Sequence, residues 1–125
     1  MKIPDAEGQI LEALWLGQPL SQDEILARVG AAQGWAAGTV RSLIQRLIAR
    51  KAIEGRRDAS GYRYHPLIAR DHFVRSESQG FLDRLFGGEV APLVSHLAHH
   101  RALTAADLQK LRALIETLEK DHDQD

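Results

Sequence analysis

The sequence predicts a mostly α-helical protein that contains one small β-hairpin. Apolar residues recur at helical spacing along most of the chain, and the pattern changes to strand-like alternation only between about Ala52 and His65. With 125 residues, 44% of them hydrophobic and 26% charged, the chain has the composition of a folded globular protein. It is long enough for one small domain or two very small ones.

Two helices are expected before the first glycine-rich loop. The first should be capped by Asp5 and should end at Gly17, where the sequence continues as Gly-Gln-Pro. Ser21 and Glu24 have the spacing of a capping box, in which each side chain accepts the backbone N–H of the other residue. The second helix should therefore run from about Gln22 to Val29.

A third helix with two distinct faces is expected after a loop bracketed by Gly30 and Gly34. Its apolar residues fall at i, i+3, i+4, i+7 and i+8, and so share the side that faces the core. They are Val40, Leu43, Ile44, Leu47 and Ile48. The side chains that must then point outward are Thr39, Arg41, Ser42, Gln45, Arg46 and Ala49. This mixture of small polar and long hydrogen-bonding groups is more typical of a recognition surface than of a solvated one.

A β-hairpin follows the third helix. A short strand is expected around residues 52–56, then a turn rich in Asp, Ser and Gly, then alternating residues from Tyr62 to His65. Pro66 should end the second strand, because its nitrogen has no hydrogen to donate to a ladder. Three helices followed by a hairpin is the element order of a winged helix-turn-helix.

Three more helices are expected after the hairpin. The first runs from about Ala69 to Phe86 and ends at two consecutive glycines. The second covers roughly Val90 to His100, and the third, opened by Thr104 and Asp107, ends near residue 120. These helices carry more apolar surface than three short helices can hide, so we expect a C₂ homodimer; a self-contained bundle is the alternative. The dimerisation residues are Phe81, Leu82, Leu85, Phe86, Leu93, Leu97, Leu111, Leu114, Ile115 and Leu118.

Charge points to a polyanionic partner for the first half of the chain. The net charge is −1, but residues 1–66 hold nine basic and seven acidic side chains, a balance of +2. Within residues 38–66, seven basic side chains meet only two acids. In a winged helix-turn-helix the third helix enters the major groove, where Arg reads guanine and Ser, Thr or Gln reads other bases. Arg56, Arg57 and Arg63 on the hairpin would hold the phosphate backbone. A basic packing helix, or a surface for an acidic protein partner, is the alternative.

Several other functions find no support in the sequence. The absence of cysteine excludes disulfides, thiolate catalysis and cysteine metal sites. There is no nucleophile elbow, P-loop or His-Glu-x-x-His motif, so an enzyme is not expected, and no cofactor is predicted. No signal peptide is recognised, and no apolar run approaches the ~20 residues of a bilayer span, which favours a cytoplasmic protein without membrane insertion. His96, His99 and His100 lie at i, i+3 and i+4 and are candidates for a zinc or copper site.

The chain resembles a known family over nearly its whole length. The segments that carry the resemblance are IPDAEGQILEALW, PLSQDEI, GWAAGTVRSLIQRLIARKAI, GYRYHPLIARDHFVRSESQGFLDRLFGG and LTAADLQKLRALIE. Together they are similar to the penicillinase-repressor family, the BlaI/MecI/CopY group of bacterial transcription factors. The most specific part is Phe81 to Gly88.

The resemblance implies a winged helix over residues 1–66 that binds palindromic operators and a helical dimerisation domain over residues 67–125. It also implies repression of the protein's own operon, often one for β-lactam resistance, and release through a membrane sensor-protease. The operator-contacting helix becomes Gly38 to Arg50, preceded by a family tryptophan at Trp35. The operator contacts that the resemblance implies on that helix are Thr39, Arg41, Ser42 and Arg46. A copper-responsive branch uses C-terminal cysteines, which this chain lacks.

The chain departs from the family pattern at three places. Trp-Ser-Pro-Lys is replaced by tryptophan and residues 36–38, Ala-Ala-Gly, which removes a Ser cap, a helix-starting Pro and a phosphate-binding Lys. We therefore expect a different operator affinity or operator sequence. The scissile Asn-Phe pair of the archetypes aligns with His96 and Leu97, which makes proteolytic control questionable here. A first-helix tryptophan is replaced by Gly8.

Overall fold

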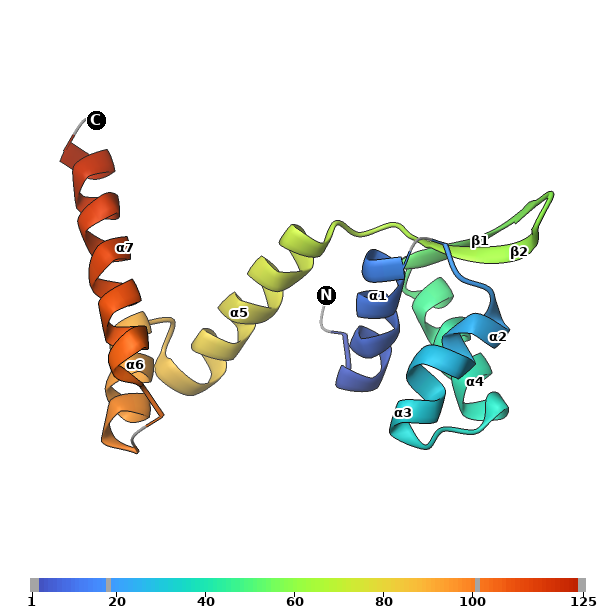
Figure 1. Cartoon of the computed structure of the whole chain (residues 1–125), viewed down its shortest axis with the longest axis horizontal. Helices are drawn as coiled ribbons and strands as arrows, with labels where there is room; N and C mark the ends of the chain where they lie inside the picture. Colours follow the sequence, from blue (N-terminus) through green and yellow to red (C-terminus); the bar gives the residue numbers. More distant parts are fainter. Residues whose placement is uncertain (1–2, 18, 101, 124–125) are drawn as a thin grey trace. The chain divides into compact units, whose positions relative to one another are not determined.

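The computed structural model describes residues 3–17, 19–100 and 102–123. The chain divides into two compact units, Met1–Ser78 and Gln79–Asp125. The elements of the first unit, in chain order, are α1 (Asp5–Gly17), α2 (Gln22–Ile25), the π-helical turn η1 (Leu26–Gly30), α3 (Ala31–Gln33), α4 (Ala37–Ala49), β1 (Ile53–Asp58) and β2 (Gly61–Pro66) (Figure 1). α5 (Arg70–Phe86) begins in the first unit, and α6 (Val90–His99) and α7 (Ala105–Asp123) belong to the second. The predicted order of helices and hairpin is confirmed.

The division lies later in the chain than the boundary expected after Pro66, because the first turns of α5 pack on the first unit. The Phe73 ring lies 5.4 Å from the Trp15 ring, centroid to centroid. The Trp15 indole N–H donates to the carbonyl of Ile68 at 2.9 Å, and a Glu77 carboxylate oxygen accepts the backbone N–H of Ile3 at 3.3 Å. These contacts join α5 and the residues just before it to α1 and the residues just before that helix.

The second helical segment begins as predicted but extends further. The Ser21 hydroxyl accepts the N–H of Glu24, and the Glu24 carboxylate accepts the N–H of Ser21, so the capping box is present. The expected loop at Gly30 is wrong, because the helix continues through this residue to Gln33 and ends at Gly34, which has φ +74°. Gly30 is buried, and a Cβ atom there would lie 2.7 Å from a methyl of Leu26. Its missing side chain serves close packing rather than a turn.

The hairpin has the predicted strands and a two-residue turn. β1 and β2 pair antiparallel, with Ile53 opposite Pro66, Arg57 opposite Tyr62 and Asp58 opposite Gly61. Pro66 is the last residue of β2, where its missing N–H is tolerated. Leu20 adds one bridge to β2, because its carbonyl accepts the N–H of Tyr64 at 2.8 Å and its N–H donates back at 3.3 Å.

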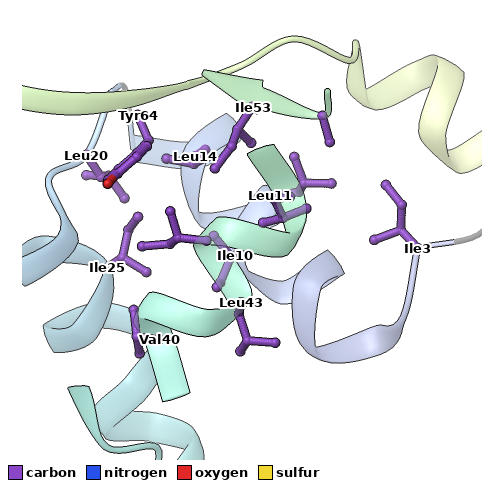
Figure 2. Packing of buried hydrophobic residues seen from close by; sticks show 13 residues of the cluster. Ile3, Ile10, Leu11, Leu14, Leu20, Ile25, Val40, Leu43, Ile53 and Tyr64 are labelled. Atoms are coloured by element: carbon purple, nitrogen blue, oxygen red, sulfur yellow. The ribbon is translucent and has the colours of Figure 1, made fainter. Parts of the chain in front are cut away.

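One hydrophobic core lies between α1, α4 and the base of the hairpin (Figure 2). Its largest fully buried apolar side chains are Ile10, Leu11, Leu14, Leu20, Ile25, Val40, Ile44, Leu47 and Ile53. Tyr64 of β2 is 7% exposed and packs on the same cluster. The predicted apolar stripe of α4 therefore belongs to this core, with Ile48 half-buried at its edge.

The ends of the later helices carry the predicted signals. α5 ends at Gly87 and Gly88, whose φ angles are +59° and +81°, and the Gly88 N–H donates back to the carbonyl of Leu82 at 2.9 Å. α7 opens with Thr104 and Asp107, whose side chains accept each other's backbone N–H. No described residue of α5, α6 or α7 is fully buried. Within the described residues, no helix combines the length and apolarity that a bilayer span requires.

Candidate nucleic-acid interface

α4 separates its side chains into a buried and an exposed face. Val40, Leu43, Ile44 and Leu47 are buried in the core, which fixes the rotation of the helix about its axis. The outward side chains form the outer face of α4, and all of them are exposed as predicted: Thr39, Arg41, Ser42, Gln45, Arg46 and Ala49. Among the described residues, the Arg41 and Arg46 side chains have no ion pair or hydrogen bond. Their guanidinium groups are therefore available to an external acceptor.

The N-terminus of α4 is open and uncapped. Ala36 occupies the N-cap position, with extended backbone angles of φ −78° and ψ 164°, and provides no side-chain hydrogen bond. Gly38 is exposed, and a Cβ atom there would meet nothing within 4 Å. The departure from the family pattern thus leaves the first N–H groups of α4 without a side-chain acceptor.

Trp35 supports the start of α4 from the core side. It is half-buried and packs against the core, and its backbone N–H donates to the carbonyl of Gly30 at 2.8 Å. A Cβ at Gly30 would also approach a Val40 methyl to 3.2 Å, so α4 lies close to the end of η1. Trp35 is one of the predicted DNA-contacting residues. Its contacts with the core place it directly before α4, the helix on which most of the other predicted contacts lie.

The C-terminal end of α4 is tied to α1 by an ion pair. The Arg50 Nε–H donates to Glu7 Oε1 at 2.8 Å, and the Glu7 side chain is 1% exposed. Arg46, one turn earlier in the chain, is exposed and takes no part in this pair. Sequence reasoning missed Glu7, because its partner is 43 residues away and no local pattern connects the two.

The three predicted arginines of the hairpin have different surroundings. Arg56 is exposed and forms an ion pair with Glu54 on the same strand. The Arg57 guanidinium lies 5.8 Å from the centroid of the Tyr62 ring and, within the described part of the chain, has no ion pair. Arg63 is half-buried, and its Nη1 donates to the carbonyl of Pro19 at 3.2 Å.

Arg63 also reaches the capping box. Its Nη1 lies 3.0 Å from Glu24 Oε1, the oxygen that accepts the Ser21 N–H. The pKa of Glu24 is lowered, first by the hydrogen bond from the Ser21 backbone, then by the hydrogen bond with the Ser21 side chain and by the nearby positive charge of Arg63. The Nε of Arg63 is buried and has no partner in the described residues. Arg63 therefore braces β2 against the start of α2, unlike Arg56 and Arg57.

The predicted dimerisation residues lie on α5, α6 and α7 with much apolar surface uncovered. The exposed ones are Phe81, Leu85, Leu114, Ile115 and Leu118, and the half-buried ones are Leu82, Phe86, Leu93, Leu97 and Leu111. Within the second unit, the Phe81 and Phe86 rings lie 6.0 Å apart, centroid to centroid. The exposed fractions of Leu114, Ile115 and Leu118 exceed one half, at 53%, 53% and 56%.

The three candidate histidines, two in α6 and one directly after it, do not assemble a metal site among the described residues. No group of three or more His, Cys, Asp or Glu side chains among the described residues could hold a metal ion. The His96 ring lies 4.6 Å from the His100 ring and 6.4 Å from the Phe86 ring, whereas His99 Nδ1 lies 2.7 Å from the carbonyl of Ser95. The candidate cleavage pair, His96 and Leu97, lies inside α6, and the His96 carbonyl accepts the N–H of His100 at 3.3 Å.

Comparisons with known proteins agree with this architecture. The family model described as Penicillinase repressor matches residues 3–117. The penicillinase repressor of Bacillus licheniformis is 21% identical over 115 residues, which are 92% of this chain and 90% of that protein. The penicillinase repressor of Staphylococcus aureus is 25% identical over 120 residues, which are 96% and 95% of the two chains.

One solved structure relates the fold to a winged helix. It is the monomeric form of Bacillus licheniformis BlaI in complex with the blaP half-operator, at 21% identity and a TM-score of 0.53. The match covers 58% of this chain and 88% of that one. The two chains therefore share the winged-helix fold over that part.

Proposed function

The chain belongs to the penicillinase repressor family of transcriptional regulators, and we propose that it binds double-stranded operator DNA through α4 and the hairpin. The observation that carries the proposal is the division of α4. One face is fixed in the core, and the opposite face exposes Thr39, Arg41, Ser42 and Arg46. A rigid helix with unpaired arginines and hydroxyls on its outer side suits the major groove.

The side chains of this face divide the work of recognition. Arg41 and Arg46 can each donate two hydrogen bonds to O6 and N7 of a guanine, a contact worth about 1–3 kcal/mol of discrimination. Thr39 and Ser42 offer short hydroxyls that donate or accept, and so suit bases or phosphates close to the helix. The uncapped first turn of α4, with Gly38 exposed, leaves backbone N–H groups that a phosphate oxygen can accept.

On the hairpin, Arg57 is the residue best suited to hold phosphate. Arg56 already has a carboxylate partner in Glu54, so part of its charge is compensated before DNA arrives. Arg63 donates a hydrogen bond to the Pro19 carbonyl and pairs with the Glu24 carboxylate, and we assign it a structural role. This order of the three arginines refines the prediction from sequence, which treated them alike.

We further propose that the protein acts as a homodimer formed by its second unit. The exposed apolar side chains of α7 are Leu108, Leu114, Ile115 and Leu118, and they lie on one side of the helix together with the half-buried Leu111. Covering such a stripe with an identical helix is the usual solution for a symmetric dimer. Two winged helices would then read the two halves of a palindrome, since one module contacts only a few base pairs.

The relatives named as penicillinase repressors favour a resistance operon as the regulated target and a cytoplasmic location.

Proteolytic release through a membrane sensor-protease would require cleavage near His96 and Leu97. A protease binds an extended chain, so this part of α6 would have to unwind first. Limited proteolysis of the DNA-free dimer, followed by mass spectrometry, would test whether this bond is accessible.

Fluorescence anisotropy decides the main proposal. The native protein is titrated against a labelled duplex from the region immediately upstream of its own reading frame and against a random-sequence duplex of equal length. We expect tighter binding to the upstream duplex and a steep loss of affinity as salt is raised. Binding that is equal for both duplexes, or insensitive to salt, would overturn it. A surface that docks an acidic protein would leave both duplexes unbound.

A further inference from the structure

The outer end of the hairpin carries an arrangement of three residues on one face. Arg57 and Tyr62 are directly opposite each other in the register, so their side chains lie on the same face of the hairpin. Gly55 lies two residues before Arg57, so a side chain at this position would point to the same face. The Tyr62 ring covers Gly55: a Cβ atom at that position would overlap the Tyr62 ring and its hydroxyl. Glycine at position 55 therefore makes room for the aromatic ring.

The Tyr62 ring is held from a second side. The Tyr64 ring lies 5.5 Å away in an edge-to-face arrangement, with an interplanar angle of 83°. Tyr64 is buried in the core and forms the bridge with Leu20. The chain of contacts thus runs from the core through Tyr64 to Tyr62, and the Tyr62 ring, although 45% exposed, has a defined orientation.

Arg57 completes the arrangement. Its guanidinium carbon lies 5.8 Å from the Tyr62 ring centroid, within the range in which a cation is attracted by an aromatic ring. A guanidinium beside a ring keeps the N–H groups on its edge available for a second partner. Immobilising a long side chain on binding costs free energy, and a side chain that is already ordered loses less.

We infer that Tyr62 is a positioning residue of the wing, which uses the space above Gly55 to hold the Arg57 guanidinium ready for a DNA phosphate. This role rests on the proposed DNA binding. It also explains why a glycine and an exposed tyrosine occur in these strands, since glycine weakens a strand interior and is retained where another group approaches closely.

The test is a double-mutant cycle measured by anisotropy on the upstream and random-sequence duplexes over a series of KCl concentrations. Tyr62→Leu should weaken binding to both duplexes by roughly two- to fivefold, the value of an exposed cation–aromatic contact. The double variant that combines Arg57→Ala and Tyr62→Leu should bind DNA no more weakly than the single variant Arg57→Ala. Tyr62→Phe, which retains the ring, should bind like the native protein.

A second variant separates positioning from hairpin stability. Gly55→Ala leaves Tyr62 and Arg57 in the sequence but displaces the ring, so it should reproduce the loss of Tyr62→Leu and should also add nothing to Arg57→Ala. Thermal unfolding shows whether each variant keeps its fold. A loss for Tyr62→Leu that persists in full in the Arg57→Ala background would overturn the inference, as would no loss at all. If the native protein binds neither duplex, the proposed DNA binding fails and the inference with it.

Discussion

Glu7 Oε1 lies 2.8 Å from Arg50 Nε, and this contact joins the first turn of α1 to the end of the proposed recognition helix. The Glu7 side chain is 1% exposed, whereas that of Arg50 is 35% exposed. A buried carboxylate is tolerated because a cation and hydrogen bonds compensate for its lost hydration. The pair therefore helps to set the position of α4 relative to α1.

Glu7→Gln should destabilise the protein by about 2–3 kcal/mol, because it leaves a half-buried guanidinium facing an amide. Urea unfolding followed by circular dichroism measures the change in the free energy of unfolding. Glu12→Gln is the matched control, since Glu12 pairs with Arg70 at 3.2 Å on the surface and a surface pair contributes about 0–1 kcal/mol. Equal effects of the two substitutions would contradict a special role for the buried pair.

Arg41→Ala should relax the sequence preference of DNA binding. The substitution removes an exposed guanidinium from the outer face of α4 without touching the core. We expect the preference for the upstream duplex to fall by a factor that corresponds to about 1–3 kcal/mol, with the salt dependence little changed. Ala49→Ser, on the same face one turn before the hairpin, serves as the control. A uniform loss on all duplexes would instead assign Arg41 to phosphate.

Arg63→Ala should act on the fold and not on DNA. Its Nη1 links β2 to Pro19 and to Glu24, so its loss should lower the free energy of unfolding by about 1 kcal/mol. The slope of log Kd against log salt should stay at the native value, whereas Arg57→Ala should lower it by about 1. A reduced salt slope for Arg63→Ala would show that this arginine leaves Glu24 to contact DNA.

Much of this arrangement follows from local sequence patterns. The stripe from Val40 to Leu47, the turn of the hairpin and the Gly87–Gly88 stop are each encoded within a few residues, and the structure confirms them. The outward direction of Arg41 and Ser42 follows from the stripe alone, because the helical period leaves them no other side.

The differences arise where tertiary contacts decide. The local sequence around Gly30 predicts a helix end, but close packing against Leu26 and Val40 keeps this glycine inside the helical segment. The local sequence predicts that Arg63 is a DNA-binding cation of the hairpin like Arg56 and Arg57. The bridge between Leu20 and Tyr64 instead places the Pro19 carbonyl where Arg63 can donate a hydrogen bond to it. Contacts of this kind join residues far apart in the chain, so no periodicity or motif could identify them.

Ile115→Glu should dissociate the proposed dimer. Ile115 is 53% exposed within the second unit, on the apolar side of α7, and a carboxylate buried there against an identical helix would have no partner. Sedimentation velocity should find a monomer at concentrations where the native protein is dimeric. Thr117→Glu, at an exposed position of the same helix, should leave the dimer intact. A native protein that is monomeric throughout would contradict the proposed assembly.

Ala36→Ser should stabilise α4 by restoring a side-chain cap. Ala36 already has the extended backbone of an N-cap, with φ −78° and ψ 164°, so a serine hydroxyl there can accept an N–H of the first turn without rearrangement. The expected gain is about 1 kcal/mol in the free energy of unfolding, the usual value of such a cap. Ala37→Ser, at the first helical position, is the control and should give no comparable gain. The same cap occupies an N–H that we assign to DNA phosphate, so Ala36→Ser should leave operator affinity unchanged or lower despite the greater stability. Tighter operator binding would mean that the stability of the first turn of α4 determines operator affinity, and that its free backbone N–H groups do not.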